Sequence, residues 1–109
     1  DNGYDGFGIG CEGDRLAGLI GNNSILMMGQ HGILVIGPNV AETFDKIYYF
    51  EQAAMTYLTA LQTGKELSLA SHEVAEKTAR QAENFESYSQ YHLNAILDVM
   101  DEEEPEYLS

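Results

Sequence analysis

Basic side chains are scarce in this sequence of 109 residues, which has five lysines and arginines against 18 aspartates and glutamates. The formal net charge of −13 would repel phosphate backbones and anionic membrane surfaces. We therefore expect neither a nucleic-acid partner nor a membrane partner. The negative charge is densest over residues 101–109, which we expect to form a solvated acidic tail.

Cysteine and long apolar runs are also nearly absent. The single cysteine, Cys11, cannot form a disulfide within the chain, which is consistent with a reducing compartment. No apolar run approaches the roughly 20 residues of a membrane-spanning helix, and no signal peptide is recognisable. We therefore expect a cytoplasmic protein, and a length of 109 residues favours a single domain over two.

Hydrophobic periodicity predicts four helices and two short strands. Residues 1–10 contain four glycines and are expected to be irregular. Asn39 followed by Glu42 is typical of a capping box, and Ser71 is a candidate helix N-cap. The predicted elements follow in this order: a helix over 12–20, strands over 25–28 and 33–36, and helices over 39–63, 72–81 and 85–100.

The two predicted strands lack the alternation of apolar and polar residues that is typical of a half-exposed strand. The apolar runs 25–28 and 33–36 would therefore lie inside a sheet that is covered on both faces. Such strands need neighbours on both edges, and a two-stranded ribbon is rarely stable by itself in water. Since the rest of the sequence supplies only helices, we infer that the chain is the C-terminal part of a larger fold. A missing N-terminal segment or a second chain would complete it.

His31 lies between the two apolar runs, close to Gly29 and directly before Gly32. A histidine in an apolar stretch must satisfy both ring nitrogens, either by hydrogen bonds at a turn or as a metal ligand. The two glycines would let the backbone bend, so that the imidazole could project from a strand end into a cavity. The residue pattern alone leaves both interpretations open.

Three further side chains have positions that call for an interpretation. Glu51 falls on the apolar stripe of the helix over 39–63, so we expect it to find an arginine or backbone donors at a helix or subunit contact. His72 follows a candidate N-cap and is expected to face solvent. His92 shares a helical face with tyrosines and is interpreted as a packing or surface histidine rather than a ligand.

Two ordered stretches resemble the C-terminal half of the domain of the class II aldolase and adducin family. They are "ILMMGQHGILVIGPNVAETFDKIYYFEQAAMTYLTAL" over residues 25–61 and "TGKELSLASHEVAEKT" over residues 63–78. The "QHG" step between two apolar strands, the stop at Gly37 and the "YYFEQAA" segment follow the family pattern in order. The whole chain, residues 1–109, is thus identified as the C-terminal portion of a single such domain.

The resemblance implies an α/β fold, a three-layer α/β/α sandwich of which this chain supplies two interior strands and about four helices. It also implies a homotetramer and a divalent metal, most often zinc, held by three histidines. His31 matches the third of these ligands. The family's His-x-His pair has no counterpart here, since the other histidines are His72 and His92. The family's acidic acid/base residue also lies upstream, so this chain alone cannot assemble the active site.

The function implied by the resemblance is that of a metal-dependent lyase of the class II aldolase type. Such an enzyme cleaves or forms a carbon–carbon bond in a small hydroxy-carbonyl substrate, including sugar phosphates, through a metal-stabilised enediolate. An epimerase, a decarboxylase or a dehydratase on the same fold stays open, as does a non-catalytic adducin-like assembly module. No catalytic residue is assigned: family members can use a tyrosine near the C-terminus as a proton donor across a subunit boundary, but no motif singles out Tyr88, Tyr91 or Tyr107.

Overall fold

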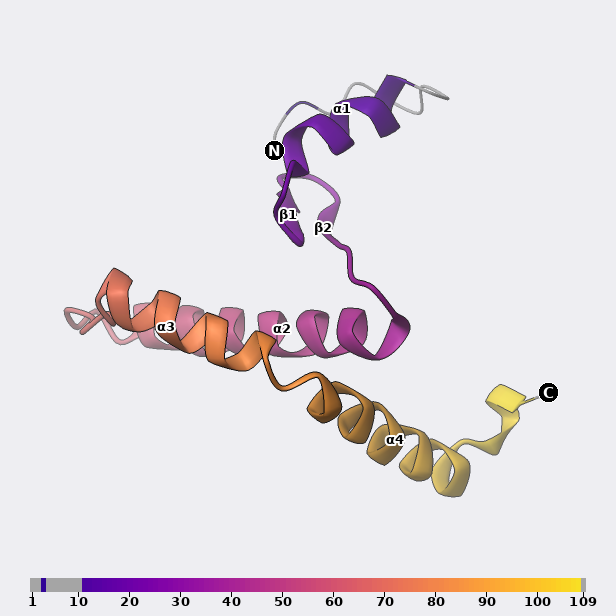
Figure 1. Ribbon diagram of the computed structural model, residues 1–109. Helices are drawn as coiled ribbons and strands as arrows, with labels where there is room; N and C mark the ends of the chain where they lie inside the picture. The colour runs from indigo at the N-terminus through magenta and orange to yellow at the C-terminus, as the bar shows by residue number, and fades with distance from the viewer. Residues whose placement is uncertain (1–2, 4–10, 109) are drawn as a thin grey trace. The chain divides into compact units, whose positions relative to one another are not determined.

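The computed structural model describes residue 3 and residues 11–108 (Figure 1). The irregular start predicted over residues 1–10 therefore lies, apart from Gly3, outside the described residues. The contacts divide the chain into two compact units, Asp1–Pro38 and Asn39–Ser109, which are described one at a time. The elements are α1 (Cys11–Ile20), β1 (Ile25–Met28), β2 (Gly32–Val35), α2 (Val40–Gln62), α3 (His72–Glu83), α4 (Glu86–Glu103) and the 3-10 turn η1 (Pro105–Leu108).

In the first unit, α1 ends where the sequence predicts a stop. Gly21 adopts a positive φ of 51°, which a glycine reaches without a clash of a Cβ atom. Its backbone N–H donates to the carbonyl of Ala17, and the backbone N–H of Asn23 donates to that of Ile20. The side-chain amide of Asn23 donates to the same Ile20 carbonyl, so the end of the helix is capped from two directions.

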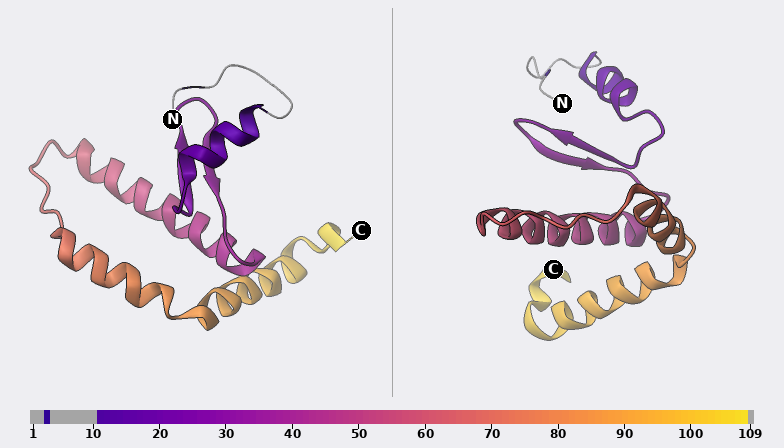
Figure 2. Two further views of the ribbon diagram at one scale, coloured as in Figure 1. Left: turned by 45° about the horizontal axis from the view of Figure 1, so that its top comes forward. Right: turned by 90° about the vertical axis from the view of Figure 1, so that its left-hand side faces the viewer.

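The two strands form an antiparallel hairpin, drawn edge to edge in both views of Figure 2. The second strand was predicted over residues 33–36 but pairs with β1 over residues 32–35. Gly32 is therefore the first paired residue, and Ile36 lies after the last pair. Ile36 still donates from its backbone N–H to the carbonyl of Ser24. Both faces of the hairpin are apolar, yet the side chain of Met27 is 63% exposed and the others are at most half-buried. The paired residues are Ile25 with Val35, Leu26 with Leu34, Met27 with Ile33, and Met28 with Gly32.

The second unit begins with the predicted capping box. The extended Asn39 accepts a hydrogen bond on its side-chain oxygen from the backbone N–H of Glu42, at 2.9 Å. Its side-chain amide donates in turn to the carboxylate of Glu42, at 2.8 Å. This reciprocal pair fixes the start of α2, and Gly64, with a positive φ of 67°, follows its C-cap.

The apolar stripe of α2 is only partly covered by the described residues. Ala41 is buried, but Met55, Leu58 and Leu61 near the other end of the helix are exposed. Glu51 is exposed as well, so the described residues give it no partner, and its expected contact at a helix or subunit interface stays a prediction. No described residue forms an ion pair or a hydrogen bond with it. The physical reason is that the stripe on which Glu51 lies meets no other element at that position.

Helix α4 packs against α2 through a histidine and its aromatic neighbours. Nδ1 of His92 lies 2.7 Å from Oδ1 of Asp45. The imidazole centroid is 4.6 Å from the Tyr48 ring, 5.4 Å from that of Phe44 and 5.7 Å from that of Tyr49. His92 is therefore a partly buried packing residue with an orienting carboxylate, as its placement among aromatic residues had suggested.

Helix α3 makes fewer contacts than its neighbours in the chain. Ser71 is its N-cap and accepts a hydrogen bond on Oγ from the backbone N–H of Val74. His72, the first helical residue, is exposed as predicted. No residue of α3 is buried, and among the described helices none combines the length and apolar composition that crossing a membrane requires.

The acidic C-terminal stretch is more regular than a solvated tail. Helix α4 was predicted to end at residue 100 but continues through Glu103, because glutamate is a good helix former. The turn η1 then brings the phenol of Tyr107 to the carboxylate of Asp101, to which it donates a hydrogen bond. The side chains over 101–108 are nevertheless exposed, so solvation and helical backbone coexist here.

We predict that loss of the Asn39 side chain destabilises the protein. Asn39→Ala removes the acceptor for the backbone N–H of Glu42 and should lower the free energy of unfolding by about 1 kcal/mol. Asn39→Asp keeps an acceptor oxygen and should stay close to the parent protein. Urea unfolding of both variants tests this prediction, and equal losses for the two would contradict it.

We also predict that Tyr107 ionises later than an ordinary tyrosine. The hydrogen bond to Asp101 raises the pKa of Tyr107 above its usual value of 10.0. A raised pKa means that the contact stabilises η1 fully below pH 10 and is lost as the pH rises through the higher pKa. Nuclear magnetic resonance of the tyrosine rings, assigned with Tyr107→Phe, measures the midpoint. Asp101→Asn should return it toward the ordinary value, and an unchanged midpoint in that variant would contradict the assignment.

Candidate functional site

The hairpin places His31 at its closed end. Met28 and Gly32 are the last paired residues, so positions 29–31 form the connecting turn. The backbone N–H of His31 donates to the carbonyl of Met28 at 3.4 Å, which closes this turn. Gly32 takes a positive φ of 94°, whereas Gly29 does not have a positive φ. Of the two glycines that the sequence singled out, Gly32 is thus the one whose backbone conformation calls for glycine.

The His31 side chain is exposed at this turn, which makes the imidazole reachable from outside the hairpin. The expectation that His31 could project into a cavity stays a prediction. The pocket found in the first unit lies at the other, open end of the hairpin, and a four-residue strand spans about 13 Å between the two ends. His31 does not line that pocket.

An acidic and a basic residue of α1 accompany His31 in the first unit. Arg15 donates two hydrogen bonds to the Glu12 carboxylate, from Nε at 2.8 Å and from Nη2 at 2.5 Å. The hydrogen bond from Arg15 lowers the pKa of Glu12 below its ordinary value against a smaller opposing effect of desolvation. Electrostatic interactions with Arg15 and with His31 lower it further. Glu12 therefore lies in the electrostatic environment of His31.

Sequence reasoning missed the pair of Glu12 and Arg15. Their separation of three residues on a helix is the spacing at which opposite charges meet, and this signal was available. The effect of His31 on the pKa of Glu12 was not predictable, because it depends on how α1 packs against the hairpin. The second missed pair, His92 with Asp45, joins residues 47 positions apart and carried no local signal.

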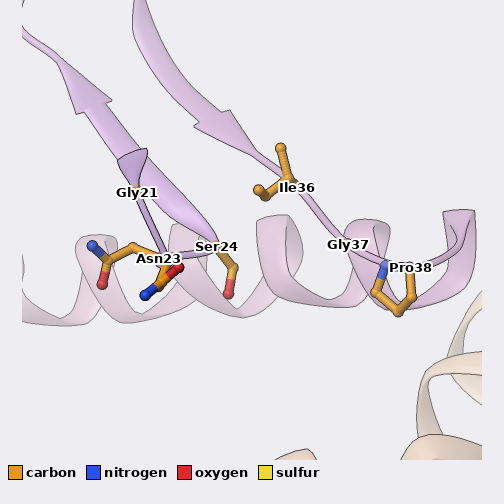
Figure 3. Close-up of a pocket in the computed structure, with 7 residues that line it drawn as sticks. Gly21, Asn23, Ser24, Ile36, Gly37 and Pro38 are labelled. Carbon is orange, nitrogen blue, oxygen red and sulfur yellow. The ribbon is translucent and has the colours of Figure 1, made fainter. Parts of the chain in front are cut away.

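The pocket of the first unit has a volume of about 470 Å³ and a polar side (Figure 3). Its lining contains amide and hydroxyl groups but no titratable side chain, so it offers hydrogen bonds and no acid or base. Polar contact with a ligand is the chemistry that such a lining supports. The lining residues come from the segments before β1 and after β2: Gly21, Asn22, Asn23, Ser24, Ile36, Gly37 and Pro38.

The described residues do not by themselves fit a metal site with three protein ligands. Within residues 11–108, no group of three histidine, cysteine or carboxylate side chains lies close enough to hold an ion. His31 belongs to the first unit, whereas His72 and His92 belong to the second. The donor chemistry of His31 fits one ligand position of such a site.

The tyrosines considered as proton donors lie on the second unit. Tyr88 and Tyr91 are exposed on α4, and the phenol of Tyr107 is held by Asp101. Among the described residues, none of these three side chains forms a hydrogen bond or a ring contact with His72 or His92, the two histidines of the same unit. Cys11, the first residue of α1, is exposed.

Comparisons with known proteins match a large part of this chain. The sequence model of the family described as "Class II Aldolase and Adducin N-terminal domain" matches residues 3–58. A curated protein of Caulobacter vibrioides, named "Putative aldolase class 2 protein", is 28% identical over 78 residues, which are 71% of this chain and 30% of that protein. The match thus covers less than a third of the length of this relative. No solved structure matches the chain.

We predict that the turn beside His31 depends on the absence of a side chain at Gly32. No atom lies within 4 Å of a Cβ built at Gly32, so Gly32→Ala meets no steric clash and suffers only the positive φ. This conformation should lower the free energy of unfolding by about 1–2 kcal/mol. Gly18→Ala, in the helical part of α1 and equally free of clashes, should instead stabilise the protein by up to about 1 kcal/mol. Thermal unfolding distinguishes the two, and a gain in stability for Gly32→Ala would contradict the prediction.

Proposed function

The chain belongs to the class II aldolase and adducin family, and from this premise we propose that the intact protein is an aldolase-type lyase. Its substrate would be a small hydroxy-carbonyl compound, with or without a phosphate group. The reaction would cleave or form the carbon–carbon bond next to the carbonyl group. The observation that carries the proposal is the position of His31 at an exposed turn between two apolar strands, within the segment that the family model matches.

We propose that His31 is one ligand of a divalent cation, with zinc as the leading candidate. A neutral imidazole is a common zinc ligand, and a three-ligand site leaves a position open for substrate. The remaining ligands would come from a segment or subunit outside the described residues. When bound, the cation would supply Lewis acidity toward substrate oxygens.

The chain's own residues would position this ligand rather than carry out proton transfer. The backbone of the turn is fixed by the hydrogen bond from the backbone N–H of His31 to the Met28 carbonyl and by the positive φ of Gly32. A fixed turn limits the directions in which the imidazole can point, so less conformational freedom would be lost when it binds a cation. Glu12, whose pKa is lowered, would be an anion in the electrostatic environment of His31 and would favour a cation bound by the neutral imidazole.

We further propose that other parts of a three-layer α/β/α sandwich cover the apolar surfaces of hairpin and helix. The exposed side chains of Met27, Leu58 and Leu61 support this proposal. Burial of each such side chain stabilises a fold by about 1.5–3 kcal/mol, so leaving them in water forgoes several kcal/mol. Residues 1–109 would be the C-terminal portion of that domain, and a homotetramer would be its assembled form.

A second candidate is a non-catalytic, adducin-like assembly module. The observation that favours it is that the described residues contain no group of three potential metal ligands. The two candidates differ in whether the intact protein carries further histidines that can meet His31. The metal content of the intact protein therefore separates them.

We predict that metal binding depends on His31. Purified intact protein should contain about one divalent ion per protomer by elemental analysis, and His31→Ala should lose it. Aldol cleavage of short hydroxy-carbonyl compounds, with and without a phosphate group, should fall by at least about a hundredfold in this variant.

His72→Ala is the matched control, because His72 is exposed on the other unit and should leave the metal in place. Full metal occupancy in His31→Ala would refute the ligand assignment. A parent protein that binds no divalent ion and cleaves no substrate would favour the assembly module.

A further inference from the structure

We draw no further inference here: the strongest candidate, the outer apolar stripe of α4 formed by Tyr88, Tyr91, Ala95 and Val99, is exposed in a chain that matches 30% of the length of its curated relative, and nothing among the described residues shows what covers it.

Discussion

The apolar surface on both faces of the hairpin β1–β2 is the constraint on which the other features depend. Ile25 and Leu26 on one strand and Ile33 and Leu34 on the other are only half-buried, and Met27 is largely exposed. A sheet with two apolar faces is stable when both faces are covered, and two strands alone are marginal in water. The same constraint governs the far half of α2, whose apolar side chains also lack cover. The proposed sandwich and the proposed tetramer would supply this cover.

The hairpin also determines where chemistry can occur. Its register leaves three residues for the turn, and Gly32 adopts the left-handed conformation that lets so short a turn close. His31 consequently lies at the closed end, where it contributes to the lowered pKa of Glu12 on α1. In the second unit, the analogous fixed point is His92, whose contact with Asp45 anchors α4 and leaves the outer stripe of that helix exposed. The two histidines thus have different roles, one as a candidate ligand and one as a packing residue.

Local signals in the sequence predicted most of the secondary structure. The Asn39 and Ser71 caps and the stop at Gly21 lie where the sequence placed them, because caps and glycine stops depend on neighbouring residues. The second strand was misplaced by one residue, since strand register is set by the turn and not by the apolar run itself. Helix α4 extends beyond its predicted end, because the helix propensity of glutamate outweighs the repulsion among the acidic side chains of the C-terminal stretch.

The sequence by itself determined the family, the order of the elements and the placement of His31 between two apolar strands. Only the tertiary structure decided that Glu51 is exposed in this chain, that His31 affects the pKa of Glu12 and that His92 meets Asp45. The physical reason is that helices, caps and turns are set by residues within about four positions of one another. The burial of a carboxylate or the partner of an imidazole depends on which distant surfaces pack together, and no local pattern contains that information.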